Sequence, residues 1–203
     1  MRPNIVGLLR FVHDLRGEFF EVAASLGWKE FTRNRGVSME SFRNVFLHLA
    51  YVEEHHIRYF CRGRAKVWPT WAAQMPRNRY RTVESVRERL RSVTEFAERR
   101  LKTWDSAPAL SKSVRWVRLG HPIRLSRGDA LAQCVSEHLL HLGEVEAMLW
   151  QLDVEPPTTL WIDRVVLSGE PPAPGPGKRV RSLAKNPKAL VARSTRARLR
   201  RKG

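Results

Sequence analysis

The segment that decides the fold is SRGDALAQCVSEHLLHLGEVEAMLWQL, which spans residues 126–152. Its apolar side chains recur every three or four residues, which is the spacing of one face of an α-helix. Ser126 with Asp129 three positions later is typical of a capped helix start, and Pro156-Pro157 follows shortly after the end. We therefore predict a helix over residues 127–152 with one face toward a hydrophobic core.

Three other segments show the same helical spacing, at about residues 3–26, 39–60 and 83–104. We expect residues 27–37 to form a link with a turn, because they include Arg33-Asn34-Arg35-Gly36. Two short β-like pieces over residues 114–125 predict a small hairpin before the last helix. Because no alternation of strands and helices indicates a parallel sheet, the expected fold class is all-α, an up-down four-helix bundle.

The composition excludes several classes of protein. Of the 203 residues, 42% are apolar, which is enough for a hydrophobic core and excludes a wholly disordered chain. No uncharged apolar run reaches the roughly 18–20 residues of a membrane-spanning helix, and the N-terminus lacks the apolar stretch of a secretory signal. The two cysteines, Cys61 and Cys134, cannot form a disulfide framework or a four-thiolate zinc site. We therefore expect a cytoplasmic protein with reduced thiols and no membrane partner.

The positive charge is concentrated near the C-terminus. The formal net charge is +17, and residues 170–203 hold 11 Lys and Arg residues against one acid. This segment opens with EPPAPGPG, the composition of a stiff linker, so we divide the chain into a helical domain, 1–169, and a disordered basic tail, 170–203. Such a tail can attract nucleic acid or another polyanion. The alternative, a solvated tail with only incidental affinity, is favoured by the absence of aromatic residues among its basic ones.

Several histidines lie on helix faces that a bundle should keep apolar. In the helix predicted over 127–152, His138 completes the apolar stripe, His141 lies at its inner edge, and Glu137 shares a face with His141. In the helix predicted over 39–60, His48 completes the corresponding stripe. Because burial of imidazoles and carboxylates is costly unless they are paired or metal-bound, these residues indicate one shared site between two helices.

A metal site of three imidazole or carboxylate ligands leaves coordination positions open, as catalytic sites do. Such a ligand set suits zinc, nickel or iron, and the sequence does not choose among the three. The alternative interpretation is that each histidine is an ordinary hydrogen-bonded core or surface group.

Two segments resemble signatures of the DinB/YfiT-like superfamily. Residues 137–157, EHLLHLGEVEAMLWQLDVEPP, resemble its last-helix signature, in which a histidine, a variable residue, Gly and Gln or Glu precede a leucine-rich stretch ending near two prolines. Residues 41–53, SFRNVFLHLAYVE, resemble its second-helix signature, with its histidine at His48. The resemblance covers roughly residues 4–165 and implies a four-helix bundle that carries a divalent metal on three histidines. Some members of the superfamily are thiol S-transferases that use bacillithiol, mycothiol or related thiols.

By this resemblance, His48 matches the first metal ligand and His141 the third. The second ligand is normally a histidine four residues before the third, and here that position holds Glu137. Either Glu137 coordinates through its carboxylate, or His138 turns in from the adjacent position, or the site binds no metal. The position in the motif favours Glu137, whereas the apolar stripe points His138 inward.

Two function classes follow. The resemblance implies a metal-dependent thiol S-transferase or hydrolase that acts on a small molecule such as a low-molecular-weight thiol. In such an enzyme, the metal lowers the pKa of a bound thiol or water. The alternative is a non-catalytic binding protein whose basic tail contacts nucleic acid or another polyanion. The sequence is also compatible with a homodimer.

Overall fold

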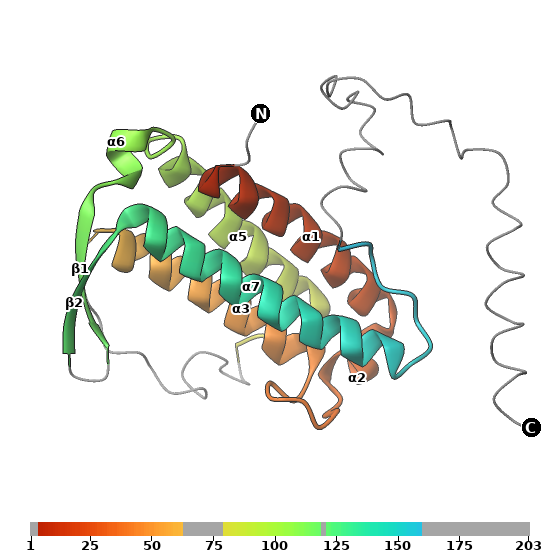
Figure 1. Ribbon diagram of the computed structural model, residues 1–203. Helices are drawn as coiled ribbons and strands as arrows, with labels where there is room; N and C mark the ends of the chain where they lie inside the picture. The colour runs from red at the N-terminus through yellow and green to blue at the C-terminus, as the bar shows by residue number, and fades with distance from the viewer. Residues whose placement is uncertain (1–3, 63–78, 119–120, 160–203) are drawn as a thin grey trace, which may run out of the picture. The chain divides into compact units, whose positions relative to one another are not determined.

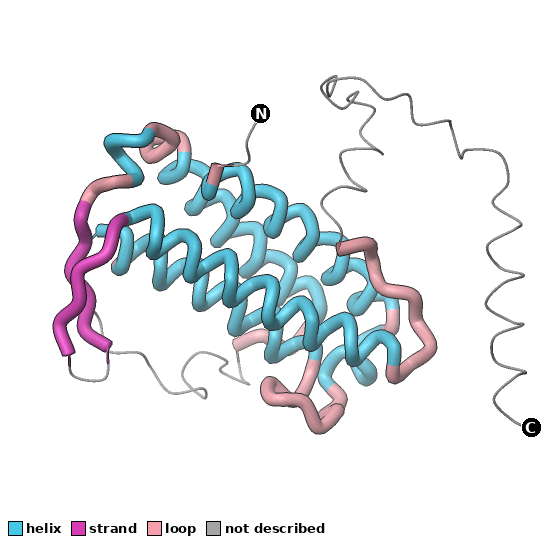
Figure 2. The backbone as a smooth tube through the Cα atoms, in the orientation of Figure 1, coloured by secondary structure: helices cyan, strands magenta, loops and turns pink. Residues whose placement is uncertain are grey.

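The structure is a computed structural model of the chain, and it describes residues 4–62, 79–118 and 121–159. The chain divides into two units, 1–159 and 160–203, and all described elements belong to the first unit. This unit is mostly helical, with one two-stranded antiparallel sheet (Figure 2). The expected domain boundary at Glu170 and the expected disordered tail lie outside the described residues.

Four long helices make up most of the first unit, namely α1 (Ile5–Ser25), α3 (Phe42–Arg58), α5 (Val83–Leu101) and α7 (Arg127–Trp150). They lie alongside one another in Figure 1, where α7 packs against α1 and α3, and α5 packs against α3 and α1. All four helices were predicted, and their ends agree with the prediction to within three residues. Among the described residues, no helix has both the length and the apolar composition that crossing a membrane requires.

The starts of the long helices follow from their capping residues. Thr82 and Ser126 each form a reciprocal capping box with the residue three positions later, which confirms both predicted starts. Helix α3 begins later than predicted, because Ser41 is its N-cap and accepts from the backbone N–H of Asn44. The residue before this cap, Glu40, has φ of +66°, a left-handed conformation that a continuous helix cannot contain.

Three of the shorter elements differ from the sequence prediction. Residues predicted as a link form the short helix α2 (Gly27–Thr32), because Gly27, with φ of +80°, ends α1 and lets the chain turn into a second helix. A 3₁₀ turn, η1 (Phe60–Arg62), and the one-turn helix α6 (Ala107–Leu110) were not predicted. The predicted hairpin is confirmed. Strands β1 (Ser113–Arg118) and β2 (His121–Ser126) pair antiparallel directly before α7.

Helix α3 is the most enclosed of the long helices. It packs against both α5 and α7, and none of its 17 residues is exposed. The hydrophobic core around it contains residues from α1, α2, α5 and α7, among them Leu9, Phe19, Phe31, Leu90 and Leu142. Several polar side chains of α3 are therefore buried, and two of them, His48 and Glu53, belong to two separate polar clusters.

Candidate metal centre

Helices α3 and α7 bring three of the predicted site residues together. His48, Glu137 and His141 each offer one ligand atom, and these atoms all lie within 4.8 Å of one another. The rings of His48 and His141 are 4.6 Å apart between centres and nearly perpendicular, at 82°. Glu137 lies one turn before His141 on α7, with its Oε2 atom 3.6 Å from Nε2 of His141. Two imidazoles and a carboxylate thus converge on one point between the two helices.

The His141 ring is held by a second carboxylate. Its Nδ1 atom lies 3.2 Å from Oε2 of Glu144, and Oε1 of Glu144 accepts a hydrogen bond of 2.5 Å from the Ser38 hydroxyl. A carboxylate can only accept, so Nδ1 of His141 is the donor, and Nε2 faces Glu137. Carboxylates orient metal-binding histidines in this way in many proteins. The sequence analysis did not identify Ser38 or Glu144, which lie far apart in the chain.

The electrostatics of the cluster favour a cation. The hydrogen bond with His141, followed by that from Gln133 to Oε1 at 2.9 Å, lowers the pKa of Glu137 to about 2, so this carboxylate is ionised. Burial lowers the pKa of His141, but Glu137 and Glu144 together outweigh burial and raise it above 6.5. Two carboxylates on one buried imidazole make a site that attracts positive charge, whether a proton or a metal ion.

The donor set fits a divalent metal. Two histidines and one glutamate are the ligands of several catalytic zinc sites, and they leave further coordination positions open. Donor atoms around a tetrahedral zinc at about 2.0–2.1 Å lie about 3.3 Å from one another. Closing the cluster on an ion therefore requires the donor atoms to approach by up to about 1.5 Å, a movement within reach of side-chain rotation.

His138 points inward, as the apolar stripe predicts, but into a different cluster. Its Nδ1 atom lies 2.8 Å from the Cys134 carbonyl, and its Nε2 atom lies 3.0 Å from Nη1 of Arg16. A carbonyl only accepts and a guanidinium only donates, so His138 has its proton on Nδ1 and is neutral. Burial, the main cause, lowers the pKa of His138 in agreement with this state. The adjacent guanidinium would repel a metal ion, so the geometry places Glu137, and not His138, with His48 and His141.

Arg16 and Glu53 form a buried ion pair beside His138. Nη1 of Arg16 donates to Oε2 of Glu53 at 2.5 Å, and Nη2 donates to the Thr94 hydroxyl at 2.5 Å. His13 lies on the other side of Glu53, with Nε2 3.0 Å from Oε1, a distance typical of an ion pair although the atoms are not aligned for a hydrogen bond. Because His138 is neutral, the 3.4 Å separation between its Nε2 and Glu53 is a contact and not an ion pair.

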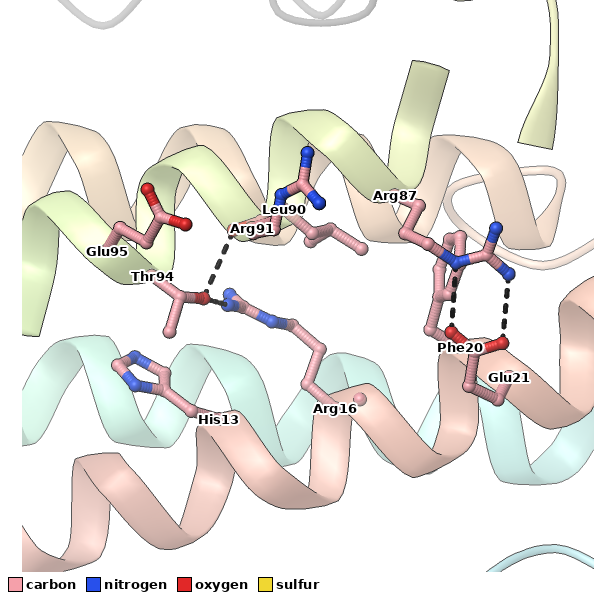
Figure 3. A pocket seen from close by; sticks show the side chains of 10 residues that line it. His13, Arg16, Phe20, Glu21, Arg87, Leu90, Arg91, Thr94 and Glu95 are labelled. Atoms are coloured by element: carbon pink, nitrogen blue, oxygen red, sulfur yellow. Dashed lines mark hydrogen bonds and ion pairs between the residues drawn. The ribbon is translucent and has the colours of Figure 1, made fainter. Parts of the chain in front are cut away.

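This buried network reaches a groove between α1 and α5. Figure 3 shows Arg16 directed at Thr94, with His13 beside it, at the inner wall of a groove of about 240 Å³. One member of this network is visible in the sequence, because Arg16 interrupts the apolar stripe that Leu9, Val12 and Phe19 form on α1. Its partner Glu53 lies on α3 and could be identified only from the packing of the helices.

The cysteine next to this network is not part of the candidate metal cluster. Cys134 is fully buried, and burial is the main reason that its pKa lies well above 9.0. Its thiol lies 3.9 Å from Nδ1 of His138. Cys134 is therefore a protonated core residue and not a thiolate ligand.

Comparison with known proteins does not assign the chain to a family. No protein-family model matches the chain, and no curated protein matches it. What points to a function is therefore the placement of His48, Glu137 and His141, together with the resemblance of two helical segments to DinB/YfiT-like signatures.

Proposed function

We propose that the chain is a DinB-like, up-down four-helix bundle that binds a divalent metal and acts on a small molecule as a thiol S-transferase or hydrolase. The observation that carries this proposal is the convergence of His48, Glu137 and His141 from two helices, with donor atoms within 4.8 Å. The packing of α1, α3, α5 and α7 and the hairpin before α7 support the bundle. The resemblance of residues 41–53 and 137–157 to the family signatures supports the activity.

Each residue of the cluster has a separate task in this proposal. His48 and His141 supply imidazole nitrogens, and Glu137 supplies a carboxylate oxygen at the position where the family has a histidine. Glu144 and Ser38 fix the His141 ring, and Gln133, a further outer residue, fixes the Glu137 carboxylate. Zinc, nickel and iron all accept this donor set.

A divalent ion bound by three protein ligands supplies an open position at which a thiol or water loses its proton near neutral pH. The carboxylate in place of a histidine adds a negative charge to the ligand set. That charge strengthens attraction for the ion but makes it a weaker electrophile, so we expect a higher pKa for the bound thiol or water than on three histidines. The activity should therefore increase with pH over a higher range than for a three-histidine site.

The proposal is tested with full-length protein purified without a histidine tag or chelator. We expect metal analysis to find close to one zinc, nickel or iron ion per chain. We also expect thiol transfer to chlorodinitrobenzene, or hydrolysis of a nitrophenyl ester, that chelation abolishes and metal restores. A matched His121→Ala variant, which removes an exposed histidine on β2, should retain both metal and activity. A chain that takes up no metal from zinc, nickel or iron solutions would contradict the proposal and favour the non-catalytic alternative.

A further inference from the structure

The β1–β2 hairpin carries positive charge on the face that points away from the core. Side chains alternate between the two faces of a hairpin. On one face, Val114 is buried and its cross-strand partner Leu125 packs against the core. The adjacent cross-strand pair, Arg115 and Arg124, therefore lies on the other face, and both residues are exposed. Figure 1 shows the hairpin at one end of the bundle, beside the first turn of α7.

No carboxylate in the described part of the chain neutralises this arginine pair. Neither Arg115 nor Arg124 forms a hydrogen bond or ion pair with a described residue. Between Asp105 and Asp129, the sequence has five Lys and Arg residues and no acid. These two flanking acids have other partners. Asp105 lies 3.7 Å from Arg10, and Asp129 accepts hydrogen bonds from the backbone and the hydroxyl of the helix cap before it.

The arginine pair does not serve the stability of the hairpin. Like charges directly opposite each other on two strands are destabilising, because their Cβ atoms are only about 4.5–5.5 Å apart. Threonine would suit both exposed strand positions without this repulsion. On α5, by contrast, Arg87, Arg89 and Arg91 each pair with a glutamate. Residues that break such a local rule without a structural gain are typical of functional sites.

A phosphate backbone has the chemistry that this face would bind. A guanidinium can bind a phosphate through two parallel hydrogen bonds, and the exposed hydroxyl of Ser113, on the same face as Arg115, is a further donor of the kind that contacts phosphates. The described residues of this face include no aromatic side chain on which unpaired bases could stack. They also include no large apolar side chain that could enter a lipid surface. A duplex therefore fits this face better than a single strand or a membrane.

We propose that the outward face of the β1–β2 hairpin binds the phosphate backbone of duplex DNA through Arg115 and Arg124. The negative backbone removes the repulsion between the two guanidinium groups. Phosphate contacts carry no sequence information, so the binding is independent of base sequence. The formal net charge of +17 attracts the duplex from a distance, and the hairpin supplies a contact of fixed geometry. The inference does not depend on the metal centre.

The salt dependence of duplex DNA binding by the full-length chain tests the proposal. Each phosphate contact contributes about 0.9 to the slope of log affinity against log salt concentration. Arg115→Thr/Arg124→Thr removes two contacts and should lower the magnitude of this slope by about 1.8. Between about 50 and 200 mM salt, the wild-type chain should then lose about 12-fold more affinity than the variant. The basic residues after residue 170 are present in both proteins, so their contribution cancels in this comparison.

Two control variants separate the hairpin contact from net charge and from folding. Arg33→Gln/Arg91→Gln removes the same charge from two arginines outside the hairpin whose side chains are 63% and 64% exposed, and it should keep the wild-type slope. Arg115→Lys/Arg124→Lys keeps the charge of the hairpin and should also keep that slope. Arg115→Thr/Arg124→Thr should unfold at no lower urea concentration than wild type, because it removes a repulsion.

Two results would overturn the proposal. One is a wild-type slope in Arg115→Thr/Arg124→Thr, and the other is an equal loss of slope in Arg33→Gln/Arg91→Gln. If Arg115→Thr/Arg124→Thr bound DNA as wild type does but lost binding to phosphatidylserine vesicles, the face would bind a membrane instead, and the proposal would be wrong.

Discussion

Removal of one charge from the buried Arg16–Glu53 pair should destabilise the fold more than any surface charge change. In the Glu53→Gln variant, the Arg16 guanidinium loses the carboxylate to which its Nη1 atom donates at 2.5 Å, while it remains buried. Two unit charges about 4 Å apart at an effective dielectric constant of about 20 attract each other by about 4 kcal/mol. Measured losses on breaking a buried ion pair are about 3–5 kcal/mol. We therefore expect Glu53→Gln to lower the free energy of unfolding by about 3–5 kcal/mol.

The assay is urea unfolding followed by far-ultraviolet circular dichroism, with Glu88→Gln as the matched control. Glu88 lies 3.8 Å from Arg91 with both side chains mostly exposed, and breaking such a surface pair costs about 0–1 kcal/mol. The double variant Arg16→Met/Glu53→Gln leaves no unpaired charge, so it should lose less stability than the two single variants added together. If Glu53→Gln unfolds at the same urea concentration as Glu88→Gln, the buried pair does not contribute as we argue.

The same pair predicts how stability depends on pH. Burial alone would raise the pKa of Glu53, but Arg16 and then His13 outweigh burial and hold that pKa well below 4.5. A carboxyl group with a lowered pKa in the folded state contributes its stability fully above its unfolded pKa and loses it as the pH falls through its folded pKa. The contribution of Glu53 should therefore be constant at pH values above 4.5 and decrease only in more acidic solution. A contribution that already decreases between pH 7 and 5 would contradict this assignment.

Three further predictions concern the cluster on α7 and the basic tail. Glu137→Gln should weaken zinc binding by tenfold or more in equilibrium dialysis. His138→Gln should leave zinc affinity unchanged but lower the free energy of unfolding. If the two variants changed zinc affinity equally, the placement of these two residues would be contradicted. Glu144→Gln should lower zinc affinity by about 10–100-fold, the usual loss when the partner of a ligating histidine is removed, and unchanged affinity would show that Glu144 does not position His141. Deletion of residues 170–203 should leave the helical circular dichroism intact and greatly weaken salt-dependent binding to heparin, because these residues hold 11 of the 37 basic residues. Undiminished heparin binding would place the anion site on the helical domain.

The helices could be predicted from the sequence because their evidence is local. Apolar spacing and capping residues such as Ser126 and Thr82 mark the same helices in the sequence and in the structure. The burial of His138 also followed from the apolar stripe of its helix. The exceptions were the short elements α2, η1 and α6, and α2 forms because a left-handed Gly27 restarts a helix in a stretch that was predicted as a link.

The pairing of polar residues could not be predicted in the same way, because it depends on which helix each side chain faces. Glu137 and His138 are neighbours in sequence, yet Glu137 lies with His48 of α3, whereas His138 contacts Arg16 of α1. The contact between Glu144 and Ser38 likewise joins residues that no periodicity relates. Such contacts arise from helix packing, and only the structure shows them.

The most direct test of the metal centre is zinc binding to the full-length chain by equilibrium dialysis, with the ligand from α3 removed. His48 is the one member of the cluster that does not lie on α7, so its effect tests whether the two helices form one site. We expect the wild-type chain and the His121→Ala control to bind one zinc ion each, and His48→Ala to lose most of this binding while its circular dichroism is unchanged. Wild-type zinc affinity in His48→Ala would contradict the three-residue metal centre.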